Sequence, residues 1–98
     1  MKTPLEFKLE IPASKQCLSS ARLAISGLAN QADFSVQEIQ EIKKAFSEAC
    51  RIAIDNAYLE QKNDSKLAIH CQVNKNKLTL AVRNKGIEID IKKSRHAH

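Results

Sequence analysis

The sequence predicts an α+β domain in which two helices pack on one face of a mainly antiparallel four-stranded sheet, in the order β-α-α-β-β-β. Four short segments alternate apolar and polar residues with a period of two, which is typical of strands with one buried face. Two longer segments repeat apolar residues at the spacing of an α-helix. Each element therefore has one apolar side, and a two-layer sandwich is the simplest arrangement that buries all of these sides.

The composition fits a single soluble domain. The chain has 98 residues, of which 43% are hydrophobic and 28% charged, and only four are aromatic, so the core must be mostly aliphatic. No apolar run approaches the roughly 18–20 residues that span a bilayer. Pro4 and Glu6 lie where a signal peptide would be apolar, so we expect a cytoplasmic protein. Cys17, Cys50 and Cys71 are then expected to be buried free thiols.

The first strand is predicted over residues 5–11, because apolar residues alternate there with charged ones and Pro12 ends the pattern. A first helix follows, with Ser14 as its expected N-cap. Gly27 weakens this helix near its end, and residues 30–33 are predicted to be a loop. The apolar residues that recur at helical spacing are Leu18, Ala21, Ile25 and Leu28.

The longest helical signal covers Phe34–Tyr58 and begins with clear start signals. Ser35 is followed three residues later by Glu38, which is a capping box. Phe34 before the cap and Ile39 four residues after the cap form a hydrophobic staple. One continuous apolar stripe consists of Ile39, Ile42, Phe46, Ala49, Cys50, Ala53, Ile54 and Ala57.

Three strands are predicted after this helix, which is expected to end near Gln61 because residues 62–65 favour a turn. The second and third strands are joined by Asn74-Lys75-Asn76, a predicted hairpin in which an Asn adopts a positive φ angle. The apolar residues alternate in the segments 67–73, 78–83 and 87–91.

The positive charge is concentrated in the C-terminal part. Residues 1–61 hold seven basic and eight acidic side chains, whereas residues 62–98 hold nine basic and three acidic ones. Such a basic region can meet nucleic acid or an acidic protein. No aromatic residue lies among these lysines to stack on bases, so nucleic-acid binding is the weaker alternative. We expect one domain over residues 1–92 and a basic flexible tail over residues 93–98.

Two strings of residues carry a resemblance to a known family. The long helix contains Ser47-Glu48-Ala49-Cys50, followed by small residues at helical spacing and then by Tyr58. The strand near residue 80 ends in Asn84-Lys85-Gly86. Together with the order of elements, these strings resemble the anti-sigma factor serine kinases, which are small ATPases of the GHKL type. The likeness extends over about residues 5–90 and implies a reduced GHKL-like fold.

The resemblance also implies roles for particular residues. In that family a Glu-x-x-x-Asn box on the central helix supplies a general base and a magnesium ligand, and a following Asp-x-Gly-x-Gly loop binds adenine. Glu48 matches the base and is the one candidate catalytic residue, but Ile52 takes the place of the magnesium ligand and has no oxygen to offer. Asn84 and Gly86 match the Asp and the first Gly, so these four positions form a vestigial nucleotide pocket.

Further departures from the family favour loss of catalysis. Glu88 replaces the second Gly of the loop and is expected to bring a negative charge toward the phosphate position. The family continues with a nucleotide lid and a second glycine box, which these 98 residues do not match. Glu48 is then expected to form only a solvated ion pair with Lys44 or Arg51. We expect His70 on a strand surface, and no metal site.

The sequence therefore predicts a bacterial regulatory protein that acts by protein–protein binding without ATP hydrolysis. The family implies a sigma factor or an anti-sigma antagonist-like protein as the partner, and a homodimer. No cofactor is expected under this hypothesis. The alternative hypothesis is an ATP-dependent serine-protein kinase with a divergent pocket, which would use ATP and magnesium.

Overall fold

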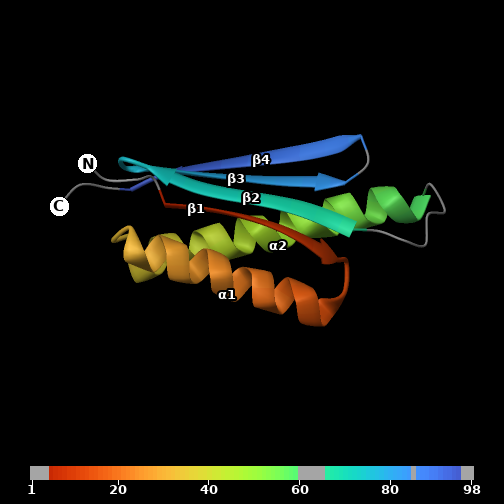
Figure 1. Ribbon diagram of the computed structural model, residues 1–98, viewed down its shortest axis with the longest axis horizontal. Helices are drawn as coiled ribbons and strands as arrows, with labels where there is room; N and C mark the ends of the chain where they lie inside the picture. The colour runs from red at the N-terminus through yellow and green to blue at the C-terminus, as the bar shows by residue number, and fades with distance from the viewer. Residues whose placement is uncertain (1–4, 60–65, 85, 96–98) are drawn as a thin grey trace.

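Two helices cover one face of a four-stranded sheet in the computed structural model, which describes residues 5–59, 66–84 and 86–95 (Figure 1). The predicted order β-α-α-β-β-β is confirmed. The elements are β1 (Leu5–Pro12), α1 (Lys15–Gln31), α2 (Val36–Leu59), β2 (Lys66–Asn74), β3 (Lys77–Asn84) and β4 (Ile87–Ser94).

The sheet has the order β1-β2-β3-β4, and every neighbouring pair is antiparallel. Both helices lie between β1 and β2 in the chain, whereas β2, β3 and β4 follow one another through two-residue turns. In the first of these turns the positive φ angle falls on Lys75, at 59°, so the prediction that an Asn adopts it is wrong. The reason is the register, because Asn74 pairs with Lys77 and Lys75 is therefore the first turn residue.

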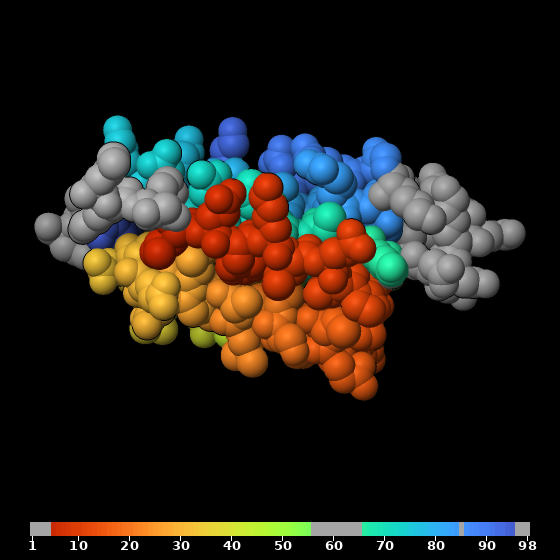
Figure 2. Space-filling model, viewed as in Figure 1, coloured from red at the N-terminus to blue at the C-terminus, as the bar shows by residue number. Residues whose placement is uncertain are grey.

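The core lies between the sheet and the helices, and it is mostly aliphatic as predicted. β2 and β3 form its floor, since alternate residues of both strands are fully buried. Figure 2 shows β1 in red and α1 in orange next to each other on the near face of the molecule. The largest fully buried side chains include Phe46, Ile25, Ile42, Leu67, Ile69, Leu78, Leu80 and Val82.

Side-chain caps begin both helices where the sequence predicts them. Ser14 Oγ accepts a hydrogen bond from the backbone N–H of Cys17, at 3.2 Å. Ser35 Oγ accepts from the backbone N–H of Glu38 at 3.1 Å, and Glu38 Oε1 accepts from the backbone N–H of Ser35 at 2.8 Å. This reciprocal pair is a capping box. The predicted end of the second helix near Gln61 lies outside the described residues.

The loop predicted at residues 30–33 is shorter in the structure, because α1 continues to Gln31. The chain leaves the helix through Asp33, whose φ angle is 66°. The N–H groups of Asp33 and Phe34 donate to the carbonyls of Asn30 and Ala29, both at 3.1 Å. These bonds satisfy carbonyls of the last helical turn, as in common C-terminal capping motifs.

β4 extends further than the sequence predicts. It continues to Ser94, so the first residues of the predicted tail 93–98 belong to the sheet. Lys93 Nζ lies 2.8 Å from Glu41 Oε1 on α2. Arg95 Nη2 donates to Asn76 Oδ1 at 2.7 Å. Residues 96–98 lie outside the described part of the chain.

The cysteines and the membrane prediction can also be compared with the structure. Cys50 and Cys71 are buried free thiols, but Cys17 is only half-buried because it lies near the start of α1. Within residues 5–59, 66–84 and 86–95, no helix is both long and apolar enough to cross a membrane.

Candidate functional site

The four nucleotide-pocket positions lie on α2 and at the β3–β4 turn. Residues 41, 48 and 52 of α2 share one side of the helix. Residue 48 lies about two helical turns after residue 41, and residue 52 lies about three turns after it. Glu41 contacts Lys93 of β4, so this side of α2 is the flank nearest β4. We call this side, with Glu41, Glu48 and Ile52, the β4 flank of α2. Asn84 and Gly86 lie at the adjoining end of β3 and in the turn that follows it.

Ile52 is 42% exposed on the β4 flank. It presents hydrocarbon at the position that corresponds to the magnesium ligand of the resembled family. No group of three or more His, Cys, Asp or Glu side chains that could hold a metal ion is present in the described part of the chain. Position 52 of this chain therefore offers no oxygen ligand to a magnesium ion.

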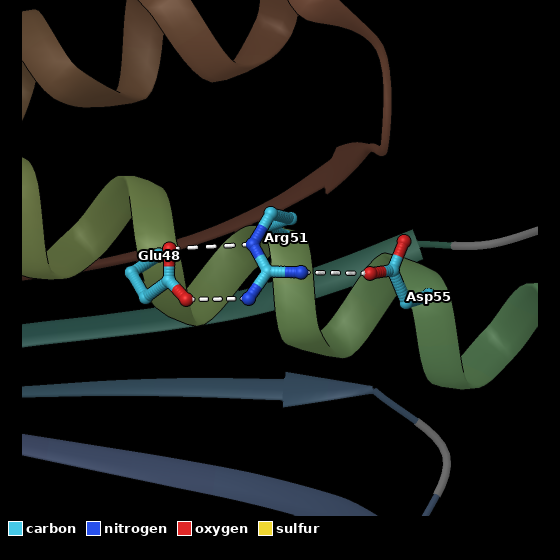
Figure 3. A network of polar contacts seen from close by, with 3 residues as sticks. All are labelled: Glu48, Arg51 and Asp55. Carbon is cyan, nitrogen blue, oxygen red and sulfur yellow. Dashed lines mark hydrogen bonds and ion pairs between the residues drawn. The ribbon is translucent and has the colours of Figure 1, made fainter.

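Glu48 forms an ion pair with Arg51, as one of the two sequence hypotheses predicts. Arg51 Nη2 lies 2.5 Å from Glu48 Oε1, and Arg51 Nη1 lies 3.0 Å from Asp55 Oδ2. Figure 3 shows Arg51 between the two carboxylates along α2. All three side chains are more than half exposed. The contact between Arg51 and Asp55 was not predicted, although a separation of four residues on a helix is a recognisable signal for such a pair.

The ion pair makes Glu48 a weaker base. The hydrogen bond from Arg51 and the charge of its guanidinium lower the pKa of the Glu48 carboxyl below its ordinary value of 4.5. A general base works best when its pKa lies near the operating pH. The geometry therefore favours a solvated ion pair over proton abstraction at Glu48.

Asn84 is nearly fully buried, with 4% of its surface exposed. Its Nδ2 donates to the backbone carbonyl of Ala53 at 3.1 Å, which ties the end of β3 to α2 one residue after Ile52. Its Oδ1 is buried and accepts no hydrogen bond in the described structure. A buried acceptor without a partner is uncommon. This oxygen takes the place of the carboxylate that binds adenine in the resembled family, but it has no surface open to a ligand in this structure. No local sequence signal predicts the contact between Asn84 and Ala53.

Gly86 and Glu88 lie on either side of the start of β4. Gly86 has a φ angle of 90° in the turn, where a side chain would be strained. Glu88 is on the outer face of the sheet, where its Oε1 lies 2.7 Å from Arg83 Nη2. The prediction that Glu88 points toward the phosphate position is therefore wrong. The reason is that residues 87–91 alternate as a strand, which turns Glu88 away from the helices.

His70 is on the outer face of the sheet, as predicted, and its Nε2 contacts the Glu6 carboxylate of β1.

A separate groove of about 250 Å³ opens between α1 and α2. Arg22 of α1 reaches across it and donates to Ser47 Oγ at 3.0 Å. Burial raises the pKa of the Cys50 thiol beneath the groove to about 11, so this thiol is a poor nucleophile. None of the four nucleotide-pocket positions lines the groove.

Comparison with known proteins decides the family. The profile of the histidine kinase-like ATPase domain matches residues 11–97, which is most of the chain. The chain belongs to this family. The resemblance seen in the sequence is thus confirmed, and the observed helices and antiparallel sheet are consistent with a reduced GHKL-like fold.

Several relatives of this chain carry the name serine-protein kinase. The chain is 32% identical to the serine-protein kinase RsbW of Bacillus subtilis (strain 168), over 86% of this chain and 52% of that protein. This chain is also 32% identical to the RsbW protein of Bacillus pumilus and 30% identical to that of Listeria innocua. Each match covers 88% of this chain and 54% of the relative. The chain therefore spans about half the length of these relatives.

Proposed function

We propose that this chain is a regulatory protein-binding domain of the histidine kinase-like ATPase family that works without magnesium-dependent phosphoryl transfer. The observation that carries the proposal is Ile52, an exposed aliphatic side chain in place of a magnesium ligand. Phosphoryl transfer from ATP depends on metal ions that bridge the phosphates and neutralise their charge. A fold of this family that lacks the ligand keeps its surfaces for protein contact.

The polar surroundings of Ile52 support the same proposal. Arg51 holds Glu48 on one side and Asp55 on the other, so both carboxylates nearest Ile52 on the helix are already engaged. Recruiting either carboxylate to a metal ion would break an existing ion pair. The cluster therefore offers no ready substitute for the missing ligand.

The partner that we propose is an acidic protein of the bacterial transcription machinery, either a sigma factor or an anti-sigma antagonist-like protein. The RsbW relatives and the resemblance to anti-sigma factors support this class of partner. The net charge of +5 supports an acidic one, because opposite charge speeds encounter between two proteins. We further propose that the protein acts in the cytoplasm as a homodimer.

One observation favours the alternative, a serine-protein kinase with a divergent pocket. The unpaired Oδ1 of Asn84 has the chemistry to accept a hydrogen bond from the adenine amino group, once the turn above it opens to expose this buried atom. The RsbW relatives carry the name of a serine-protein kinase, which supports the same alternative. Under this hypothesis the rest of the nucleotide contacts would come from outside the described residues.

Nucleotide binding separates the two functions. Titration calorimetry of the chain with ATP, with and without magnesium, is expected to show no magnesium-dependent binding. A matched set of variants consists of Glu48→Ala, Asn84→Ala and, as a surface control, Glu10→Ala. Micromolar binding that requires magnesium and disappears in the first two variants, but not in the control, would establish the kinase alternative.

A further inference from the structure

The groove between α1 and α2 has aliphatic walls and a closed floor. Figure 1 shows the two helices side by side on one face of the sheet. Leu18 of α1 and Ile54 of α2 line the groove, and both side chains are half-buried and pack against the core. Phe46 and Cys50 form the floor and are at most 2% exposed. The groove is therefore a shallow apolar site supported by the core.

The rim of the groove has an excess of positive charge. Arg51 and Asp55 belong to it, and these two side chains pair with each other at 3.0 Å. Lys15 and Arg22 also line the groove, and neither forms an ion pair within the part of the chain that the structure describes. A cleft lined by charge of one sign attracts ligands of the opposite sign. An anionic ligand therefore fits this rim.

Arg22 reaches across the groove with hydrogen-bond donors to spare. Its Nη1 donates to Ser47 Oγ at 3.0 Å, and its Nη2 donates to Ser19 Oγ at 3.3 Å. A guanidinium has five N–H donors, so three remain for a ligand. Burial raises the pKa of the Cys50 thiol and the charge of Arg22 opposes that rise, which agrees with a guanidinium close to the floor. Arg22 can therefore bind a carboxylate and keep both serine contacts.

The Ser47 hydroxyl supplies a second donor beside Arg22. Ser20 and Ser26 on α1 donate their hydroxyl protons to the carbonyls of Gln16 and Arg22, four residues earlier in the helix. Ser47 makes no such bond among the described residues, and its Oγ accepts from Arg22 instead. Its proton is therefore available to an anion that Arg22 holds.

The size and lining of the groove indicate the rest of the ligand. Phe46 and Ile54 are eight residues apart on α2, so the groove extends over about 12 Å of this helix. Its volume of about 250 Å³ lies just below the range of about 300–1,000 Å³ that is usual for sites of drug-sized molecules. Leu18 and Ile54 offer aliphatic walls, whereas the ring of Phe46 is fully buried and presents no face for stacking. A short aliphatic tail therefore suits the groove best.

We propose that the α1–α2 groove binds a small aliphatic carboxylate, with its carboxylate on Arg22 and Ser47 and its tail along Leu18 and Ile54. The inference concerns the chain by itself and depends on neither nucleotide nor a protein partner. An acidic protein segment is the competing occupant. A stable protein interface covers about 800 Å² of each partner, far more than a groove of this size offers, so the small ligand is favoured.

Three probes test the proposal by NMR titration of the isotope-labelled chain. Octanoate has both the charge and the tail, octanol has the tail alone, and acetate has the charge alone. Octanoate is expected to shift the amide signals of residues that line the groove, and to bind about tenfold more tightly than octanol. Acetate is expected to bind more weakly than octanoate. Equal affinities of octanoate and octanol, or shifts that do not cluster at the groove, would overturn the proposal.

Matched variants separate the role of the charge from that of the fold. Arg22→Gln is expected to weaken octanoate binding by about tenfold and to leave octanol binding unchanged, which also shows that the groove is intact. Ser47→Ala retains the charge and is expected to weaken octanoate binding by about threefold. Lys77→Gln removes one positive charge from an exposed position outside the groove, and the affinity for octanoate should not change.

Two results with these variants would contradict the proposal. Equal weakening by Arg22→Gln and Lys77→Gln would show that octanoate responds only to the net charge of the chain. Unchanged octanoate binding in both Arg22→Gln and Ser47→Ala would remove the proposed carboxylate site. A synthetic acidic amphipathic peptide is titrated in parallel. If the peptide shifts the signals of the groove and octanoate does not, the occupant is a protein segment and the proposal is wrong.

Discussion

The buried face of α2 and its β4 flank obey different constraints, although they belong to the same helix. Phe46, Ala49 and Ala53 are at most 2% exposed and pack in the core, whereas Glu48 and Ile52 face solvent. The fold depends on the three buried side chains, because the core is close-packed and the loss of one would leave a cavity. The flank carries chemistry in the resembled family, and in this chain it presents the partly exposed side chain of Ile52. Membership of a fold family therefore does not establish the family's reaction.

The largest effect should come from the buried face. Phe46→Ala is expected to lower the free energy of unfolding by about 3–5 kcal/mol, because it removes a fully buried aromatic ring. Urea denaturation followed by circular dichroism measures this loss. Glu48→Ala, two residues along the same helix, serves as the control and should leave the midpoint nearly unchanged. Comparable losses in the two variants would remove the distinction between face and flank.

Asn84 lies at the boundary between the two regions and should have an intermediate effect. Asn84→Asp keeps the shape of the side chain but turns the donor toward the Ala53 carbonyl into an acceptor. The expected loss at neutral pH is about 1–3 kcal/mol, the usual cost of a buried polar group without its partner.

The pH dependence of this variant has a defined sign. Burial and the facing carbonyl should raise the pKa of the introduced carboxyl in the folded state above its unfolded value. The protonated carboxyl can donate to the Ala53 carbonyl, so part of the stability should return at low pH and be lost as the pH rises through the folded-state pKa. Urea denaturation of the Asn84→Asp variant at several pH values measures this change in the free energy of unfolding. A loss that does not vary with pH would mean that Asn84 does not hold Ala53.

The smallest effect on stability should come from the flank. Arg51→Ala removes both the hydrogen bond and the charge that lower the pKa of Glu48, so this pKa is expected to rise toward 4.5. Any stability from the pair is present above the unfolded pKa and is lost as the pH falls through the lower folded-state pKa. Titration by NMR measures the shift. Lys44→Ala is the control and should leave the Glu48 titration unchanged.

Features set by short-range spacing could be predicted from the sequence. The capping box of Ser35 and Glu38 depends on a separation of three residues, and the pairing of Glu48 with Arg51 depends on the same separation. The alternation of apolar residues predicted the four strands, since side-chain direction along a strand has a period of two. These interactions form within a single element, so its own sequence contains all the information.

Features that join distant segments could not be predicted in the same way. The bond from Asn84 to the Ala53 carbonyl joins β3 to α2, and the sequence around either residue does not indicate the other. The position of the positive φ angle at Lys75 depends on how β2 and β3 align, because a different alignment would move the turn by a residue. The direction of the Glu88 side chain was predicted wrongly for a related reason. It depends on whether β4 forms and pairs with β3, which the residues near Glu88 do not determine alone.

The placement of both helices between β1 and β2 has a consequence for how the chain folds. β2, β3 and β4 need only two-residue turns to pair, whereas Pro12 of β1 pairs with Lys66 of β2 across both helices. Closing so long a loop costs entropy before any contact between its ends is gained. The three C-terminal strands form a locally connected meander, and β1 is the strand whose addition has the highest entropic cost. The rate of folding is therefore expected to depend on how readily α1 and α2 bring β1 back to the sheet.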